Sequence, residues 1–197
     1  VADDGGAPIG ISNMEQADAV ATDADGNAYV TGWVQGYREF GPISVSVVRD
    51  CYIAKYDPTG TEQWVRTFGG PGNSMEVMVR RIKVDPNEGV YVCGYLTSMP
   101  LDSIAIFDTD TVFMGGYESH AFLAKYDLNG NFQWVRHGGS EPYGAAAHDL
   151  DIDEQGNITV VGKIAYTSTF SGQTLVNTTW FDHGLLLKYA PDGTLLN

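Results

Sequence analysis

Apolar and polar positions alternate along most of this chain, in short runs that small turn residues separate. Over residues 28–33, Tyr29 and Thr31 alternate with Val30, and the run is rich in β-branched and aromatic residues. Such a period of two predicts half-buried β-strands. Turns of the form Asp-x-x-Gly, as at 57–60, suit hairpins because Asp bonds the backbone ahead of it and Gly accepts a positive φ. No segment sustains a 3.6-residue apolar period, so the pattern predicts an all-β protein.

The same pattern recurs in three tandem copies. A first unit closes at a glycine in each copy, at Gly32, Gly94 and Gly162. A second unit carries a lysine followed by tyrosine and a Gly-ended turn, and its lysines are Lys55, Lys125 and Lys188. Both sets of spacings indicate a repeat of about 65 residues.

Each copy predicts four short strands. In the first copy one strand ends at Asp23, two cover 28–33 and 52–56, and the last contains 62–66, with a looser connection between the second and third. A four-stranded antiparallel sheet repeated at this length predicts the blades of a β-propeller. The predicted organisation is a leading segment over 1–15, the tail of a preceding blade, and blades over 16–72, 73–142 and 143–197. The completeness of the third blade is left open.

Composition agrees with this class and excludes several functions. The 197 residues include 24 glycines and 12% aromatics, which suits a turn-rich all-β protein. A formal net charge of −14 repels phosphate backbones and anionic membrane surfaces, so we expect no nucleic-acid binding and no docking on membranes by charge. Because no apolar run approaches 18 residues, we expect no membrane insertion. The first residues lack the basic and apolar regions of a signal peptide.

The repeat resembles the bacterial SBBP-type β-propeller repeat of cell-surface and secreted proteins. The matching motifs are Asp-x-x-Gly-Asn-x-Tyr-Val-Thr-Gly at 23–32, Phe-Leu-Ala-Lys-Tyr-Asp-x-Asn-Gly-Asn at 122–131, and Gln-Trp-Val-Arg at 63–66 with Gly69 and Gly70 after it. The resemblance implies an extracellular or cell-surface bacterial protein. It implies a non-enzymatic scaffold, adhesion or structural filament element, whose partners are proteins or glycans at the cell surface.

Three blades are too few for a closed ring, since propellers have about four to eight. Residues 5–8 match the glycines at 69–70 and the proline after them, so both ends of the sequence fall within or beside a fourth strand. The favoured interpretation is a segment of a longer array. The alternative is self-association through open blade edges, which would complete a ring or extend into a fibre.

The sequence contains no recognisable catalytic motif and no Cys/His metal spacing, so we name no catalytic or metal-binding residue and favour a non-enzymatic role. The alternative is a glycan-binding, hydrolase or lyase propeller with its site on the ring face. No cofactor is expected. Residues 23–27 mimic the start of a calcium loop, but a hairpin turn is the favoured interpretation because the later ligands are missing. Cys51 and Cys93 are predicted to be buried free thiols, with one disulfide as the alternative.

Several polar and aromatic positions recur. Asp50, His120 and His183 each precede the repeat lysine by five residues, where they either cap a strand entrance or gather at one face of the ring. His137 and His148 have no counterparts and are predicted to be surface or loop residues. The repeat lysines, with Arg66 and Arg136, are expected to neutralise carboxylates within each blade. The periodic aromatics are expected to pack between blades: Trp64, Trp134, Tyr56, Tyr126 and Tyr189. The candidates for ligand contact follow the second strand: Trp33, Tyr37, Tyr95 and Tyr166.

Overall fold

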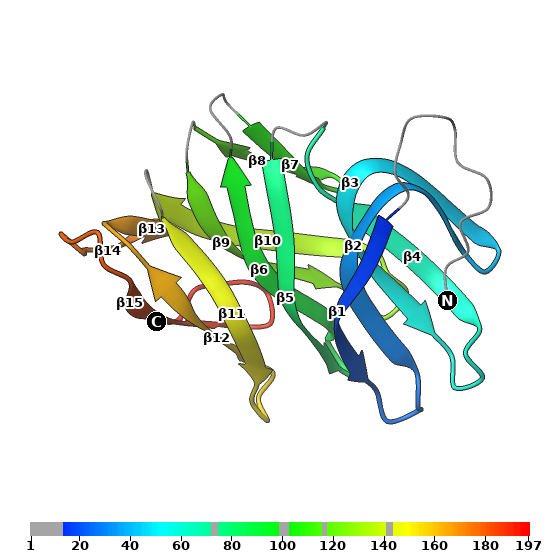
Figure 1. Ribbon diagram of the computed structural model, residues 1–197. Coiled ribbons are helices and arrows are strands. Elements are labelled where there is room, and N and C mark those ends of the chain that lie inside the picture. The colour runs from blue at the N-terminus through cyan, green and yellow to red at the C-terminus, as the bar shows by residue number, and fades with distance from the viewer. Residues whose placement is uncertain (1–13, 72–74, 99–102, 116–117, 141–143) are drawn as a thin grey trace.

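The structure, a computed structural model, describes residues 14–71, 75–98, 103–115, 118–140 and 144–197, so the predicted leading segment lies almost wholly outside the described residues. This part of the chain contains fifteen strands, all paired antiparallel, and no helix (Figure 1). The predicted all-β class is therefore confirmed.

Sheet 1 consists of four consecutive strands in the order in which they occur in the chain. They are β1 (Met14–Thr22), β2 (Ala28–Phe40), β3 (Ile43–Tyr56) and β4 (Glu62–Phe68). The predicted loose connection is wrong: β2 and β3 continue as a paired hairpin as far as the turn at Gly41, whose φ is +55°. Valines alternate with exposed serines over 44–47, so one side of this hairpin is apolar and packs on the outer face of sheet 1.

Sheet 2 repeats this arrangement with β5 (Met75–Asp85), β6 (Gly89–Ser98), β9 (Ser119–Tyr126) and β10 (Phe132–Ser140). The connection between β6 and β9 forms a separate hairpin of β7 (Ser103–Phe107) and β8 (Asp110–Met114). It reaches back to sheet 1, where Ile106 bridges to Gly69.

Sheet 3 consists of β11 (Ala145–Ile152), β12 (Ile158–Ile164) and β15 (His183–Tyr189). Within the described residues no fourth strand follows, and Leu195 makes a single bridge to Tyr189. The connection between β12 and β15 forms a hairpin of β13 (Ser168–Phe170) and β14 (Gln173–Leu175), which pairs onto β10 of sheet 2. Both connecting hairpins thus contact the last strand of the preceding sheet.

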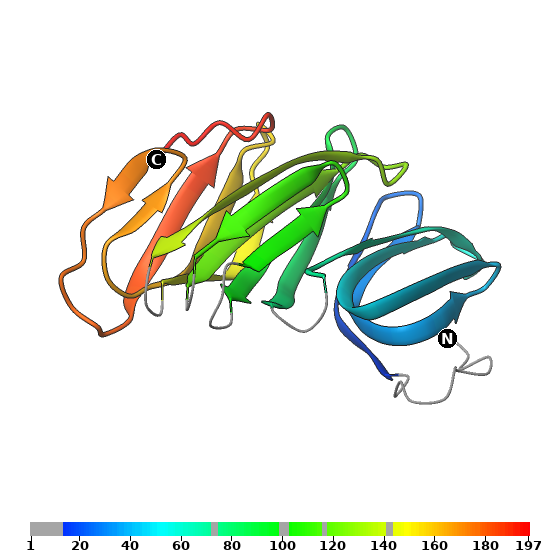
Figure 2. The same ribbon diagram turned by 90° about the horizontal axis from the view of Figure 1, so that it is seen from above.

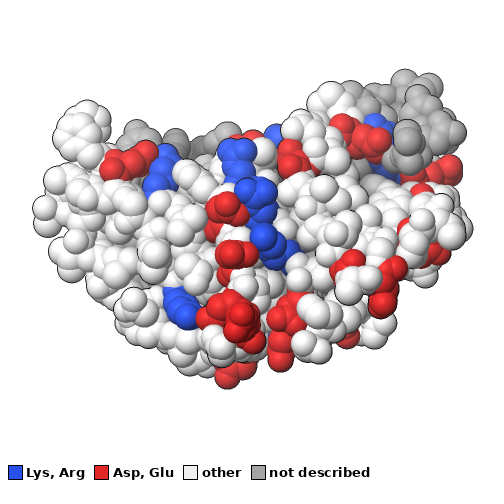
Figure 3. All heavy atoms as spheres, turned by 90° about the horizontal axis from the view of Figure 1, so that it is seen from below, with Lys and Arg blue, Asp and Glu red and all other residues white. Residues whose placement is uncertain are grey.

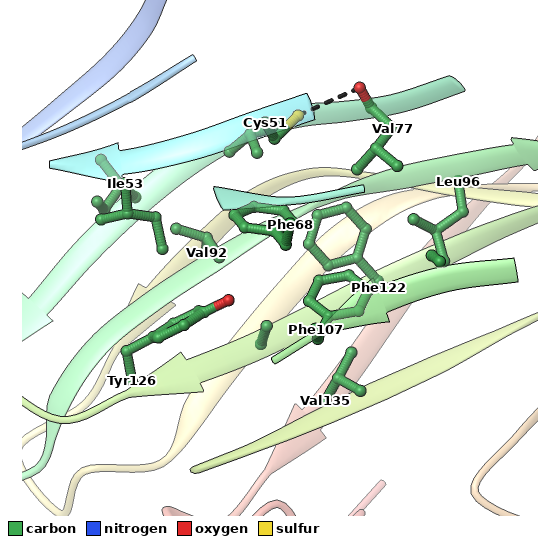
Figure 4. Packing of buried hydrophobic residues seen from close by; sticks show 14 of the residues in the cluster. Cys51, Ile53, Phe68, Val77, Val92, Leu96, Phe107, Phe122, Tyr126 and Val135 are labelled. Atoms are coloured by element: carbon green, nitrogen blue, oxygen red, sulfur yellow. Dashed lines mark hydrogen bonds between the residues drawn. The ribbon is translucent and has the colours of Figure 1, made fainter. Parts of the chain in front are cut away.

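The three sheets lie one behind another in an open stack (Figure 2). Alternate residues of sheet 2 face opposite neighbours: Val92 and Phe122 pack towards sheet 1, whereas Cys93 and Leu123 pack towards sheet 3. Phe68 of sheet 1, Phe107 of the β7–β8 hairpin and Phe122 meet at the centre of the first junction (Figure 4). Because sheet 2 is covered on both faces, its two central strands, β6 and β9, are almost continuously buried.

The repeated glycine that closes the first unit has a steric cause. In each sheet the first strand carries a β-bulge opposite this glycine. A Cβ at Gly32, Gly94 or Gly162 would lie about 2 Å or less from a main-chain carbonyl oxygen of that first strand. Glycine is therefore required at this position, because the bulged first strand leaves no space for a side chain. The bulge and the glycine recur together in all three sheets.

Candidate functional site

The recurring polar position is occupied by Asp50, His120 and His183. In sheets 1 and 2 it lies opposite a glycine at the end of the last strand. In the strand register Cys51 pairs with Phe68, which sets Asp50 beside Gly69, and His120 pairs with Gly139. A Cβ at Gly69 would lie within 3 Å of the Asp50 carboxylate, and one at Gly139 would lie equally close to the His120 ring. The repeated Gly-Gly pair thus makes room for these side chains. His183 in sheet 3 is exposed and lies within 3.1 Å of the Thr179 hydroxyl.

The structure brings His120 together with His137, which the sequence did not pair. The two rings stack with centroids 5.2 Å apart, and their Nδ1 atoms lie 3.0 Å apart. Glu118 Oε2 lies 3.4 Å from His120 Nε2 on the other side. The prediction of a surface or loop position for His137 is therefore wrong, because His137 lies on β10 directly beside β9.

Both histidines are held in the neutral form. A single proton fits between the two Nδ1 atoms, so one imidazole donates and the other accepts. Burial lowers the pKa of His120 and of His137 to about 4. Burial raises the pKa of Asp50 to about 6, because the charged form of a carboxyl group is the deprotonated one. In sheets 1 and 2 the polar position therefore carries half-buried groups, Asp50 and His120, whose charged forms the fold disfavours.

A second recurring position was missed in the sequence: the bulged residue of the first strand. It is Asp18 in β1, Arg80 in β5 and His148 in β11, and each is exposed. His148 is a surface residue, as predicted, but it lies on a strand and has counterparts, contrary to the prediction that it has none. The signal that could have located it is its fixed distance before the repeat glycine, which the diversity of side chains obscured.

The first strands of sheets 2 and 3 are joined by ion pairs beside these bulges. Arg81 donates two hydrogen bonds to the Asp149 carboxylate, and Lys83 Nζ lies 3.1 Å from Asp151 Oδ1. Arg80 stacks over the Tyr95 ring at 5.3 Å. Figure 3 shows a face on which Lys and Arg atoms form a narrow column between Asp and Glu atoms. In a chain of net charge −14, these cations are matched locally by carboxylates.

The repeat lysine, tryptophan and arginine bind the next sheet through its main chain. In sheet 1, Lys55 Nζ and Trp64 Nε1 donate to the Leu128 carbonyl, and Arg66 Nε donates to that of Gly130. In sheet 2, the equivalent side chains donate to the turn of sheet 3: Lys125 and Trp134 to Pro191, and Arg136 to Gly193. The same three donors therefore hold the same turn at both junctions.

These junction contacts correct the role predicted for the repeat arginines and confirm the packing predicted for the repeat tryptophans. Lys125 and Lys188 do pair with carboxylates of their own sheets, Glu88 and Asp153, each at 2.8 Å. Arg66 and Arg136, however, hold turn carbonyls of the following sheet instead of neutralising carboxylates of their own. The predicted packing of the tryptophans between repeats is confirmed, since both are buried at the junctions.

The Asp-led turns are hairpin turns, as favoured. Asp23 accepts hydrogen bonds from the main chain and side chain of Asn27 and from the Tyr29 hydroxyl. In the last turn of the same sheet Asp57 accepts from Thr59 and Thr61, and these bonds hold the Asp57 pKa below its usual range. Within the described residues no group of three or more His, Cys, Asp or Glu side chains is placed to hold a metal ion. The calcium alternative stays a prediction.

Of the aromatic candidates for ligand contact, Trp33 lies beneath the Arg49 guanidinium at 5.0 Å, and the Tyr37 hydroxyl donates to Glu39. All four candidates are half-buried. A more exposed aromatic pair was missed: Trp180 and Phe181 stack at 4.6 Å and are 67% and 62% exposed. No repeat spacing marks this pair, because it lies in the longest connection of sheet 3.

Both cysteines are buried free thiols, which confirms the favoured prediction. Cys51 Sγ contacts the Val77 carbonyl across the first junction at 3.2 Å (Figure 4). Burial raises the pKa of both thiols to about 12, so neither is a reactive thiolate at neutral pH. In this part of the chain no helix is long and apolar enough to cross a membrane.

Comparison with known proteins gives one distant similarity. No family model matches the chain. Over 156 residues it is 24% identical to the uncharacterized WD repeat-containing protein L264 of Acanthamoeba polyphaga mimivirus. The match covers 79% of this chain but 9% of the viral protein, so the chain spans less than a tenth of the length of this relative.

Proposed function

We propose that this chain is a set of β-propeller blades that serves as a non-enzymatic scaffold of a bacterial cell-surface or secreted protein. The observation that carries the proposal is the repetition of one junction. Lys55, Trp64 and Arg66 donate hydrogen bonds to main-chain carbonyls in the last turn of the following sheet. Their counterparts one repeat later donate to the equivalent carbonyls of the next sheet. A sheet that needs neighbours on both faces is the structural unit of a propeller or a stacked array.

The use of the charged residues supports a binding scaffold over a catalyst. The lysines and arginines at the two junctions hold turns, and the repeat aspartates cap hairpins. Arg81 pairs with Asp149, and Lys83 pairs with Asp151. The similarity to a WD repeat-containing protein agrees with a propeller. The cell-surface location rests on the resemblance to SBBP-type repeats.

Protease shaving of intact cells that make the natural full-length protein tests this proposal. Brief trypsin treatment should release peptides from this chain while a cytosolic marker protein stays intact. Recovery of these peptides only after the cells are lysed would overturn the surface location. Turnover of a substrate at the repeated Lys-Trp-Arg junction, lost in a folded Arg66→Met variant, would overturn the scaffold role.

Glycan binding is the second candidate function, because of Trp180 and Phe181. Exposed stacked aromatic rings offer apolar faces to which sugar rings can bind. A glycan array probed with the wild-type chain and with Trp180→Ala tests this candidate. Binding should fall at least tenfold in Trp180→Ala and persist in the control Phe113→Ala, which removes an equally exposed aromatic ring on β8. Equal loss in both variants, or no glycan signal at all, would reject it.

A further inference from the structure

A groove lies at the edge of the first junction, and both of its walls belong to this chain. Strands β3 and β4 of sheet 1 form one wall, and the last turn of sheet 2, over 127–130, forms the other. The groove has a volume of about 460 Å³, which is in the range of sites for small molecules. Its lining includes two repeat cations, two exposed amides and two apolar side chains: Lys55, Arg66, Gln63, Asn129, Trp64 and Leu128.

Lys55 differs from its counterpart in sheet 2. Lys125 lies 2.8 Å from Glu88 Oε2 and is buried, whereas Lys55 is half-buried. Gly26 occupies the repeat position of Glu88, so sheet 1 has no carboxylate at that place. Among the described residues, Lys55 Nζ donates a single hydrogen bond, to the Leu128 carbonyl. Since an ammonium group carries three N–H donors, two are left for a ligand.

The aspartate that could reach Lys55 is held by a tyrosine. In sheet 3 the equivalent pair, Lys188 and Asp153, lie 2.8 Å apart. In sheet 1 the Tyr29 ring lies 5.2 Å from Lys55 Nζ, and the Tyr29 hydroxyl donates to Asp23 at 3.1 Å. Across the part of the chain that the structure describes, no carboxylate oxygen lies within 4.0 Å of Lys55 Nζ. In a chain of net charge −14, this cation is therefore available to an external anion.

Arg66 contributes a second cationic donor to the groove. Its Nε and Nη1 atoms donate to the carbonyls of Gly130 and Val65, and its guanidinium lies 5.8 Å from the centre of the Trp64 ring. These contacts fix the guanidinium in place. Its Nη2 has no acceptor among the described residues, and none of their carboxylate oxygens lies within 4.0 Å of it. Arg66 can therefore donate to a ligand without giving up its contacts at the junction.

The exposed amides of Gln63 and Asn129 lie beside these cations in the lining. Gln63 donates from Nε2 to Asp57, which leaves its Oε1 to accept. The Asn129 side chain makes no hydrogen bond within the described residues. Asp127, the carboxylate of the same turn, accepts from the main-chain N–H groups of Asn129 and Asn131 and is thereby committed to the turn. Amide groups both donate and accept, which matches the hydroxyl groups of a ligand.

We propose that this groove binds a sugar acid, whose carboxylate accepts from Lys55 and Arg66 and whose hydroxyl groups bind the amides of Gln63 and Asn129. A groove of this volume holds more than an inorganic anion, and its exposed side chains are polar. A ligand with one carboxylate is favoured over an acidic peptide or polymer, because the field of a chain of net charge −14 repels each further negative charge. The inference goes beyond the proposed scaffold role and concerns a different place from the exposed aromatic pair of sheet 3.

NMR titration of the isotope-labelled chain with sodium glucuronate at low salt tests the inference. The Trp64 indole N–H is the reporter, because it donates to the Leu128 carbonyl in the groove at 3.1 Å. The Trp134 indole has the equivalent place at the second junction and is the internal control, since Glu88 already holds Lys125 there. Glucuronate should shift the Trp64 resonance saturably and leave that of Trp134 in place. Glucose, which lacks the carboxylate, should shift neither.

Two matched pairs of variants test the residues of the groove. Lys55→Met should weaken glucuronate binding about tenfold or more, because a charge-assisted hydrogen bond is lost, whereas Lys188→Met should bind like wild type. Asn129→Asp adds a negative charge to the groove and should also weaken binding. Its control, Gln173→Glu, makes the same change from amide to acid at an exposed position on β14, outside the groove. Asn129→Asp removes no hydrogen bond of the junction, so it tests the groove even if Lys55→Met does not fold.

The absence of a saturable Trp64 shift with glucuronate would overturn the inference. Acetate that binds as tightly as glucuronate would overturn the choice of a sugar, since the carboxylate alone would then be recognised. A capped Ala-Glu-Ala peptide that binds more tightly than glucuronate would overturn it in favour of an acidic peptide. Equal weakening by Asn129→Asp and Gln173→Glu would show that the binding responds to net charge and not to this groove, which would also overturn the inference.

Discussion

Arg66 donates a hydrogen bond from Nε to the Gly130 carbonyl at 2.7 Å, across a separation of 64 residues in the chain. The same guanidinium donates from Nη1 to its own strand at Val65. Arg66 thus fastens the last strand of sheet 1 to the last turn of sheet 2, and Arg136 repeats the contact one sheet later.

Replacing Arg66 with methionine should lower the free energy of unfolding by about 1.5–3 kcal/mol, because a charge-assisted bond is lost and a carbonyl acceptor loses its donor. Methionine keeps much of the apolar stem, so packing changes little. Urea denaturation measures the effect. The exposed control Arg80→Met should change stability by less than about 0.5 kcal/mol. Equal effects at the two sites would contradict the role assigned to Arg66.

Alanine at Gly94 should be strongly destabilising, by about 3 kcal/mol or more, since its Cβ would lie 1.8 Å from the Met78 carbonyl oxygen and the bulge would have to shift. Gly184 is the matched control, because a Cβ there meets nothing within 4 Å. Gly184→Ala should be neutral to within about 0.5 kcal/mol. Thermal and urea unfolding of both variants measure the effect. Equal stability of the two variants would contradict the prediction and show that the bulge can relax around the added Cβ.

Two equivalent tyrosines should respond differently to loss of the hydroxyl. The Tyr29 hydroxyl donates to Asp23 at 3.1 Å, so Tyr29→Phe should cost about 1 kcal/mol. The Tyr91 hydroxyl is buried without a hydrogen-bond partner among the described residues, so Tyr91→Phe should be neutral or stabilising. Denaturation curves recorded side by side give the comparison. A loss of stability in Tyr91→Phe as large as that in Tyr29→Phe would show that the Tyr91 hydroxyl has a partner.

Asp50 should weaken the fold at neutral pH. Its pKa rises from 3.8 to about 6 on folding, because burial disfavours the carboxylate. The folded state therefore binds more protons than the unfolded state between these values, and the contribution of Asp50 to stability falls as pH rises through this range. Asp50→Asn should be more stable than wild type at pH 7 and gain little at pH 4. The exposed control Asp110→Asn should show no such trend between the two pH values in urea titrations.

The histidine pair should act in the opposite direction. The pKa of each imidazole falls from 6.5 to about 4 on folding, so the unfolded state binds more protons in between. Their contribution to stability is complete above pH 6.5 and is lost as pH falls towards 4. A double variant His120→Asn, His137→Asn should lose less stability than wild type over this range. The control His148→Asn, at the exposed bulge, should lose as much stability as wild type over this pH range. If the double variant also lost as much stability as wild type, the histidine pair would be excluded as the origin of the pH dependence.

Much of the local structure follows from the sequence. The alternation around Tyr29, the Asp-x-x-Gly turns and the repeat spacing predict the strands and their order, and the recurrence of Trp64 and Trp134 predicts their burial between repeats. The length of the β2–β3 hairpin was underestimated, because its alternating valines and serines become a strand only when one side finds an apolar face.

The candidate site depends on pairing that the sequence does not show. His137 meets His120 only because the register of β9 and β10 sets them side by side. Asp18, Arg80 and His148 share a bulge position, yet a bulge is a property of the paired backbone and tolerates any side chain that points outward.

The repeat, the strands and the turns can be read from the amino-acid sequence, because they follow from local periodicity and from the conformational preferences of Gly, Asp and Pro. The groups that Arg66 and Trp64 bind depend instead on how the sheets pack. Their acceptors are main-chain carbonyls, which every residue possesses, so nothing in the side chains of Leu128 or Gly130 identifies them as partners. The stacking of one sheet on the next selects these carbonyls by position.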